Sequence, residues 1–292
     1  MNFNRFFDVH EFKSTVYDYL MEDEVLNNLQ LSIVNGTNIV NGNDNSEWLM
    51  SVVTDDGGAI VLIAICTKPF NLLLYEPRGK ALPGAIEFLA RQLRHIGYQP
   101  PGVFAPSDLA HRFASAYSAA TCQGDGSIDR LPENKVKMRL ILMKLEKLAD
   151  YKKAPGEFRF LEEGDLSFLP KWERQFCIDC NLPLYSEFDT EARIRGRLGK
   201  DTHFIWVDGQ PVAQAAFGRE TPGIAVVNWV YTPLPFRARG YATSVVAEVS
   251  RAILARGKRC ACLFADAANK TSCSVYRKLG YEDVCVFDEI KF

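Results

Sequence analysis

Histidine is scarce in this sequence of 292 residues, whose four histidines stand singly along the chain. None has a second potential ligand at the spacing of a metal site. The sequence also lacks a Gly-x-Ser-x-Gly turn and a Gly-x-x-x-x-Gly-Lys-Ser/Thr loop. These absences give no support to metalloenzymes, serine hydrolases or enzymes that transfer phosphoryl groups from nucleotides, and we predict no metal cofactor.

An excess of charge of one sign is also lacking, since the net charge is -2 and the pI is near 6.1. Such a chain offers no overall basic surface for a nucleic-acid backbone or an anionic membrane. No apolar run approaches the length of a membrane span, and the first residues lack the apolar core of a secretion signal. We expect a cytoplasmic protein without a nucleic-acid or membrane partner.

Cysteine pairs at regular spacings are absent as well. The eight cysteines are scattered through a chain that is large enough to fold without cross-links, so they are predicted to be free thiols. Cys177 and Cys180 form a lone Cys-x-x-Cys without a second pair or a nearby histidine. We interpret them as buried thiols rather than as a zinc site.

The composition that is present, 47% hydrophobic and 24% charged, is that of a globular protein with room for two cores. A charged run over 149–156 ends in Pro-Gly and divides the chain into halves of similar length. We therefore predict domains at 1–150 and 156–292.

The two halves show strands and helices in the same order. Apolar, β-branched runs and helical spacing predict, in the first half, strands at 47–55, 59–66, 71–75 and 103–105 and helices at 82–95 and around 109–117. The second half has strands at 202–207, 212–218, 225–231 and 260–265, a helix through 245–253 and another ending at Gly280. The segment 136–145 fits both the alternating pattern of a strand and the spacing of a helix, and we prefer to interpret it as a strand.

This shared order predicts an internal duplication, in which Leu73-Leu74-Tyr75 matches Trp229-Val230-Tyr231 and Phe104-Ala105 matches Phe264-Ala265. The first half is four residues shorter between these landmarks, and we place the missing residues in the loop before its first helix. Asn269 and Tyr276 then fall opposite Leu109 and Ala116, with Tyr117 as an alternative match one residue away.

The most informative segment is the loop Arg237-Ala238-Arg239-Gly240-Tyr241-Ala242, which follows a predicted strand and begins a predicted helix. Amides at a helix start lack partners within the helix, and the positive end of the helix dipole favours an anion. Small residues at 240 and 242 let the main chain come close to a diphosphate. The segment therefore predicts a site for a diphosphate.

This loop, after Val230-Tyr231-Thr232-Pro233, resembles motif A of the GNAT superfamily of acyl-CoA-dependent N-acetyltransferases. The segment from Asn269 to Tyr281 resembles motif B of that superfamily, with Asn, a small residue, Tyr, Gly and an aromatic residue at the family's intervals. The resemblance implies an α/β fold with a mixed sheet, repeated as two GNAT-like domains in tandem. Only the C-terminal domain retains the acyl-CoA motifs, so the N-terminal one is interpreted as degenerate.

The resemblance also implies roles for individual residues toward acetyl-CoA. Main-chain groups of Trp229, Val230 and Tyr231 would bind the pantetheine as an added strand. Asn269 and Ser272 would steady the pantetheine arm, and Tyr276 would give its proton to the leaving sulfur. The diphosphate would bind to the loop residues, which are Arg237, Ala238, Arg239, Gly240, Tyr241, Ala242 and Thr243.

The base for the incoming amine is not evident. Asn228 stands where many GNAT relatives carry a glutamate, and an amide does not take up a proton at neutral pH. Four carboxylates are candidates only by their proximity in the inferred layout, and each is interpreted as a surface residue more readily than as the base; they are Glu187, Asp189, Glu220 and Asp266. A water chain is the other alternative.

The function expected from the sequence is therefore direct transfer of an acetyl group from acetyl-CoA to a primary amine of a small molecule or peptide. Two alternatives stay open. One is an acyl-CoA sensor that binds without turnover, and the other is a tandem GNAT aminoacyl transferase that uses charged tRNA. The near-neutral charge speaks against tRNA as a partner.

Overall fold

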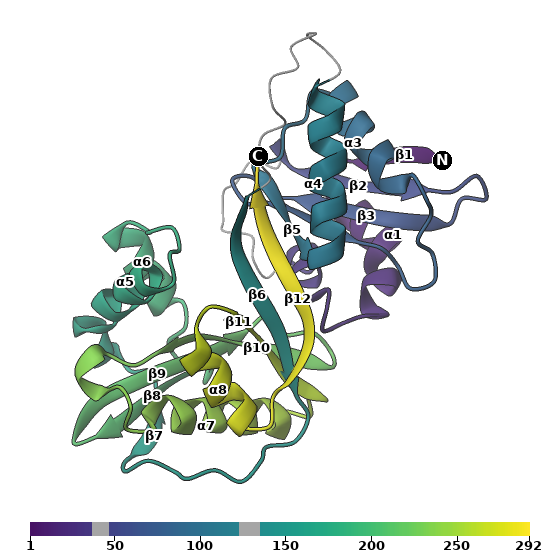
Figure 1. Ribbon diagram of the computed structural model, residues 1–292. Helices are drawn as coiled ribbons and strands as arrows, with labels where there is room; N and C mark the ends of the chain where they lie inside the picture. Colours follow the sequence, from purple (N-terminus) through teal and green to yellow (C-terminus); the bar gives the residue numbers. More distant parts are fainter. Residues whose placement is uncertain (37–46, 123–134) are drawn as a thin grey trace. The chain divides into compact units, whose positions relative to one another are not determined.

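The computed structural model describes residues 1–36, 47–122 and 135–292 of the chain. The chain forms two compact units (Figure 1). Unit 1 consists of Met1–Leu142 and Val284–Phe292, and unit 2 is Met143–Asp283. This division differs from the one predicted at 150–156, because strand β6 passes through the boundary and the last residues of the chain join unit 1.

Unit 1 contains a sheet in which neighbouring strands are antiparallel, except that β4 and β5 are parallel. Along the sheet its strands are β1 (Asn2–Phe6), β2 (Leu49–Thr54), β3 (Ile60–Cys66), β4 (Leu72–Tyr75), β5 (Gly102–Pro106) and β12 (Glu282–Lys291). β6 (Val136–Leu145) begins in unit 1 and ends in unit 2. The strand prediction for 136–145 is confirmed.

Helices cover both faces of this sheet. Because side chains alternate along a strand, Leu72 and Leu74 pack with helices α3 (Ala85–His95) and α4 (Ser107–Cys122). Leu73 and Tyr75 pack on the other face with helices α1 (Val9–Met21) and α2 (Asn28–Val34). The sheet is therefore buried on both sides, which is why its strands are almost wholly apolar.

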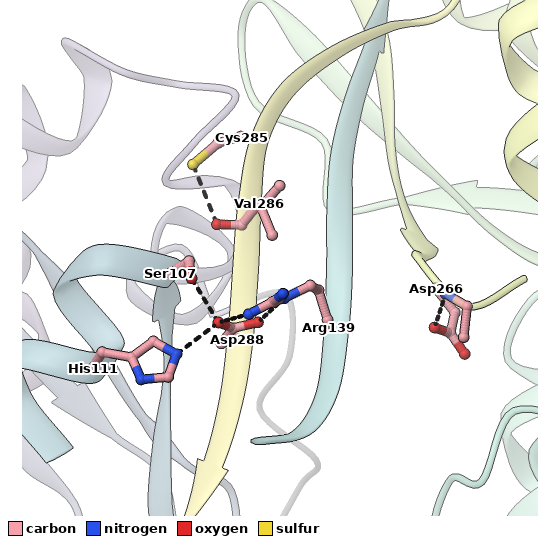
Figure 2. Close-up of polar contacts among 8 residues, drawn as sticks. Ser107, His111, Arg139, Asp266, Cys285, Val286 and Asp288 are labelled. Carbon is pink, nitrogen blue, oxygen red and sulfur yellow. Dashed lines mark hydrogen bonds and ion pairs between the residues drawn. The ribbon is translucent and has the colours of Figure 1, made fainter. Parts of the chain in front are cut away.

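Hydrogen bonds and an ion pair to the buried carboxylate of Asp288 hold the end of β12 in unit 1. Residues 287–291 pair with 102–106 of β5, and Asp288 in this stretch is fully buried. Its carboxylate accepts hydrogen bonds from Ser107 Oγ at 2.6 Å, His111 Nε2 at 3.0 Å and Arg139 Nε at 2.7 Å (Figure 2). Arg139, and to a smaller extent Ser107 and His111, lower the pKa of Asp288 to about 2.

Asp288→Asn is therefore expected to lower the free energy of unfolding of unit 1 at pH 7 by about 2–3 kcal/mol. Since the pKa of Asp288 is lower in the folded state than in the unfolded state, this contribution is present above about pH 4. It is lost as the pH falls from about 4 to about 2. Denaturant unfolding of both proteins at pH 7 and pH 2.5 measures it, and the two proteins should differ far less at the lower pH.

Asp283→Asn is the matched control. Asp283 lies at the other end of β12, in unit 2, and also binds an arginine through two bonds, but Asp283 and Arg277 are half exposed. We expect less than about 1 kcal/mol from this exposed pair. Equal destabilisation by the two substitutions would contradict the role of Asp288.

Unit 2 repeats the strand order of unit 1. From the edge its strands are β7 (Glu157–Phe160), β8 (His203–Asp208), β9 (Gln210–Gly218), β10 (Ile224–Tyr231) and β11 (Cys260–Asp266), and the end of β6 follows β11. The first four are antiparallel neighbours, and β10 and β11 are parallel. The α/β class with mixed sheets is confirmed.

The helices of unit 2 also lie on two faces. Helix α7 (Tyr241–Ala255) packs along β8 to β11, and α8 (Lys270–Lys278) packs on β11. Helices α5 (Leu169–Asp179) and α6 (Glu187–Arg195) lie on the other side of the sheet, where Leu169 and Ile194 pack on Ile205 of β8 (Figure 1). Short 3-10 turns at Glu163–Ser167 and Leu234–Phe236 complete the unit.

The four residues that the first half lacks between its landmark strands are not missing from the loop, where the sequence placed them. Nine residues separate β4 from α3 and nine separate β10 from α7, and both loops end in a left-handed glycine, Gly84 or Gly240. The four missing residues belong to the helix, because α3 has 11 residues and α7 has 15. The placement of the deletion in the loop was wrong.

Unit 1 nevertheless lacks two features that unit 2 has, namely an irregular pairing before its parallel strand pair and polar residues opposite Asn269 and Tyr276. β3 and β4 pair without a register shift, whereas β9 and β10 have one. Leu109 is buried in the apolar core and Ala116 packs against it, so neither supplies a polar group.

The seven cysteines whose side chains the structure describes are all free thiols, as predicted. The side chain of Cys122 lies outside the described part. No helix within 1–36, 47–122 or 135–292 is both long and apolar enough to cross a membrane.

Candidate functional site

Strands β10 and β11 diverge toward their carboxyl ends. In unit 2, which is described without gaps, their pairing runs from Ile224 opposite Cys260 to Val226 opposite Cys262 and stops there. β10 nevertheless continues to Tyr231 and β11 to Asp266. The main chain of β10 beyond Val226 is therefore free to pair with a ligand on this side.

A β-bulge lies in the diverging part of β10. Asn228 pairs with Ala216 and Tyr231 pairs with Gln214, so Trp229 and Val230 lie opposite the single residue Ala215. Trp229 has a φ of 54°, which is rare for a residue with a side chain. The bulge turns the main-chain groups of 229 and 230 away from regular pairing, at the place that the sequence predicted for the pantetheine.

The loop between β10 and α7 has the backbone geometry of an anion site. Ala238 and Gly240 have φ values of 62° and 85°, and Gly240 caps α7 without a side-chain hydrogen bond. Within the described structure, the amides of Tyr241, Ala242 and Thr243 donate no hydrogen bond to the protein. Three amides at the positive end of a 15-residue helix are thus left for a ligand.

The three large side chains of this loop have different surroundings. Arg237 donates to the Thr232 carbonyl at 2.9 Å and to Asp179 at 2.5 Å, so its guanidinium braces the loop against α5. Tyr241 is buried and its hydroxyl donates to Asp208, which leaves only its amide on the ligand side. Arg239 is exposed and forms no ion pair with a described carboxylate, although its guanidinium lies close enough to the Tyr241 hydroxyl to affect the pKa of that group. Of the two arginines, Arg239 is the one available to a phosphate.

The residues predicted on motif B lie on α8. Asn269 is its N-cap, and Asn269 Oδ1 accepts from the Ser272 amide at 3.0 Å. This bond explains the spacing of the two residues without a ligand, since an N-cap commonly satisfies the amide three residues on. The Ser272 hydroxyl remains half buried without a bond to a described residue.

Tyr276 lies on the inner face of α8 and is only 7% exposed. Its ring packs edge-on against Tyr281, with 5.9 Å between the ring centroids. Burial raises the pKa of the Tyr276 hydroxyl, and the nearby thiols of Cys180 and Cys273 raise it further. The hydroxyl is therefore protonated across the physiological pH range, and it is positioned near the end of α5.

Helix α5 connects the bulge with this tyrosine. Phe176 packs on Trp229 with 5.2 Å between the ring centroids, and Trp172 packs on Tyr231 at 6.0 Å. Cys180 at the end of the same helix lies close enough to Tyr276 to affect its pKa. The diverging strands, the loop and Tyr276 therefore belong to one region of unit 2.

The four carboxylates considered as bases have other surroundings. Asp189 binds Ser186 at the start of α6, and Glu220 pairs with Arg256 and Lys258. Asp266 accepts a hydrogen bond from the Ala268 amide, and Glu187 is exposed in the first turn of α6. Asn228 donates weakly to Val226 at 3.4 Å. None of these side chains lines the open pocket beside Trp229.

Sequence reasoning missed a buried charged group in this region. Glu173 is 2% exposed and forms an ion pair with Arg197, whose guanidinium also contacts His203 Nδ1 at 3.3 Å. His203 Nε2 contacts Gln214 at 2.9 Å, and burial lowers the pKa of His203 to about 3, so this imidazole is neutral. No local spacing reveals the group, because its members come from α5, the segment after α6, and two strands.

No group of three or more His, Cys, Asp or Glu side chains in the described part of the chain is placed to bind a metal ion. The polar groups at the diverging strands are mainly main-chain amides and hydroxyls. Such donors suit phosphates and carbonyl oxygens.

Comparison with known proteins agrees with this geometry. The model of the FR47-like protein family matches residues 208–288, which include the bulge, the loop and α8. The search of curated proteins finds no sequence match. Similarity to solved structures, in contrast, extends over the whole chain.

Three of these structures cover most of the chain at low identity. A GNAT-family acetyltransferase from Colwellia psychrerythraea has a TM-score of 0.60 and 11% identity, with 100% of both chains covered. A GCN5-related N-acetyltransferase from Sphaerobacter thermophilus has a TM-score of 0.63 and 16% identity, covering 89% of this chain and 84% of its own. A Drosophila protein has a TM-score of 0.61 and 13% identity, covering 99% and 98%.

These similarities concern fold rather than sequence. They confirm the resemblance that was drawn from residues 237–242 and 269–281. The chain has the fold of the GNAT acetyltransferases, and the FR47-like match lies in its C-terminal region.

Proposed function

We propose that the protein is an N-acetyltransferase that transfers an acetyl group from acetyl-CoA directly to a primary amine. The observation that carries the proposal is the joint position of the unpaired main chain of β10 and the unpaired amides at the start of α7. Both lie at the carboxyl ends of parallel strands, where α/β proteins commonly bind ligands. The unpaired strand main chain suits the extended thiol arm of coenzyme A, and the free helix amides suit the diphosphate at the other end of that arm.

The thioester end would be bound by β10. The pantetheine amides would pair with the main chain from Asn228 to Tyr231, as an added strand does. A main-chain N–H at the bulge would donate to the oxygen of the tetrahedral intermediate. The diphosphate would bind the amides of Ala238 to Thr243, with Arg239 adding a charge-assisted hydrogen bond.

The reaction needs two proton movements. The amine nitrogen attacks the thioester carbon, the C–N bond forms, the C–S bond breaks, and the nitrogen loses a proton while the sulfur gains one. Because burial raises the pKa of Tyr276 well above that of a typical thiol, its hydroxyl is suited to donate a hydrogen bond to the developing thiolate. With Asn228 at the family's usual acidic position, water would take the amine proton. The thiolate, stabilised by the Tyr276 hydroxyl, would take its proton from solvent.

Two measurements test the proposal together. Calorimetric titration with acetyl-CoA should show binding at one site, and a panel of amines should release free thiol from bound acetyl-CoA. Binding without thiol release from any amine would favour the sensor, and salt-sensitive binding of tRNA would favour the aminoacyl transferase. Failure of acetyl-CoA to bind would overturn the proposal altogether.

A further inference from the structure

The open pocket beside Trp229 in unit 2 has a cavity volume of about 10 Å³, which is room for about one water molecule. Trp229 contributes to its wall, and the main chain of the same residue forms the bulge that would bind the thioester. A single residue thus connects the cavity with the reacting groups. The cavity is too small for an acceptor molecule, but it is large enough for a water that receives a proton from one.

The wall of this cavity includes a buried carboxylate. Glu173 of α5 lines the cavity although its side chain is only 3% exposed. Arg197 Nη2 donates to Glu173 Oε1, and no described residue donates to Glu173 Oε2. Because a buried oxygen without a donor is costly, Glu173 Oε2 is the acceptor that a water in this cavity would satisfy.

Such a water has enough polar partners to be held. Thr190 also lines the cavity, and its Oγ1 donates to the Ser186 carbonyl at 2.8 Å, so the lone pairs of this hydroxyl remain for a water. The hydroxyl of Tyr185, another residue of the wall, bonds no described residue. Together with Glu173 Oε2, the two hydroxyl groups offer the two to four hydrogen bonds that a buried water commonly makes.

The charges near Glu173 leave it able to take up a proton. The titratable and charged groups around it are Arg174, Cys177, Tyr185, Arg193, Arg197 and His203. Burial raises the pKa of Glu173, and the positive charges of Arg197 and Arg193 offset this rise only in part. Burial also raises the pKa of the Cys177 thiol, so this neighbour is a neutral thiol rather than a competing base. Glu173 is therefore a carboxylate with more than the usual affinity for a proton.

Acetyl transfer needs an acceptor for the amine proton, and the amide of Asn228 is not one. We propose that a water molecule in this cavity passes the amine proton to Glu173. As the C–N bond forms, the nitrogen loses its proton to the water, and the water gives one of its own protons to Glu173 Oε2. The water is thereby restored, and Glu173 becomes neutral until it releases the proton to solvent. The inference rests on the proposed function and adds to it the final proton acceptor.

Glu173→Gln keeps the shape of this side chain and removes the proton acceptor. With any amine that releases thiol from acetyl-CoA, kcat should fall by about 100-fold or more. Affinity for acetyl-CoA, measured by calorimetry, should change by less than about threefold, because the cofactor does not occupy the cavity.

The pH profile separates proton transfer from a structural role. Both the amine and Glu173 must be deprotonated, so activity is lost as the pH falls. In the unaltered protein, log(kcat/KM) should rise by about two per pH unit below the pKa of Glu173 and by about one above it. Glu173→Gln should show only the slope of about one.

Arg197→Gln is the matched control, since it breaks the same buried ion pair and keeps the carboxylate. Both variants should have a lower Tm than the unaltered protein. Without the charge of Arg197 the pKa of Glu173 rises, so the steep part of the profile should move to higher pH. Above this part, Arg197→Gln should keep kcat within about tenfold of the unaltered protein.

Each outcome has a definite meaning. Equal kcat in Glu173→Gln and the unaltered protein, or an equal loss in both variants without a change in the pH profile, would overturn the inference and leave the proposed function intact. If Glu173→Gln does not fold, the unaltered protein decides, because a slope of about one over the whole acidic range would also overturn the inference. Thiol release from no amine at all would remove the proposed function and the inference with it.

Discussion

Gly240→Glu is expected to abolish measurable binding of acetyl-CoA, with a loss of affinity of at least about 100-fold. The substitution places a carboxylate at the N-cap of α7, next to the three free amides that would bind the diphosphate. It also puts a side chain on a residue with a φ of 85°, which only glycine adopts without strain. Calorimetric titration with acetyl-CoA measures the loss.

Gly257→Glu controls for both the charge and the strain. Gly257 follows the other end of α7, has a φ of 80°, and has no atom within 4 Å of an added Cβ. At Gly240 the added Cβ would meet Ala154 Cβ at 3.6 Å, which is ordinary contact, so neither change overpacks the core. We expect Gly257→Glu to keep acetyl-CoA affinity within about threefold, because its charge lies at the far end of a helix about 22 Å long. Comparable loss in both variants, with both still folded, would contradict the proposed diphosphate site.

Loss of an arginine charge in the loop should weaken acetyl-CoA binding less than Gly240→Glu does. Arg237 already binds Asp179 and Thr232, so Arg239 is the arginine left for a phosphate. Arg239→Gln should weaken acetyl-CoA binding by about 3- to 10-fold, as one exposed charge-assisted bond does.

Tyr276→Phe is expected to lower kcat by about 100-fold or more while the affinity for acetyl-CoA changes little. The hydroxyl forms no hydrogen bond with a described residue, so its removal leaves no partner unsatisfied in the protein. Since burial raises the pKa of this hydroxyl, Tyr276 should also cause no fall in kcat up to about pH 10. Steady-state rates across pH, with any amine found to be a substrate, measure both effects.

Tyr281→Phe provides the comparison. Tyr281 is a buried tyrosine that packs against Tyr276, but its hydroxyl bonds with Ser250 at 2.8 Å. Its loss should cost about 1 kcal/mol of stability and leave kcat nearly unchanged. Equal kcat in Tyr276→Phe and the unaltered protein would remove the tyrosine from the mechanism.

Local patterns predicted most of the elements near the site. The strands at 49–54, 60–66 and 224–231 carry β-branched runs bounded by turn residues, and the loop before α7 has its glycine at the position that needs a positive φ. The helices α1, α2, α5 and α6 were not predicted. The bulge at Trp229 was also missed, because a bulge depends on the register of two strands and leaves no mark in one of them.

Long-range contacts account for the other differences. Glu173, Arg193 and Arg197 come together because α5 and the end of α6 pack on the same side of the sheet, and no sequence spacing encodes this. The four-residue deletion was misplaced because counting between two strands cannot distinguish a shorter loop from a shorter helix. The place of β12 next to β5 joins residues about 185 apart, beyond any periodicity argument.

The late position of this strand has a consequence for synthesis on the ribosome. The sheet of unit 1 receives β12 only after all of unit 2 has been translated, so its β5 edge stays uncovered during elongation. Nascent chains stalled before residue 284 should therefore be more easily cleaved by protease in unit 1 than released chains are. Unit 2, whose residues are contiguous, can complete its own folding first.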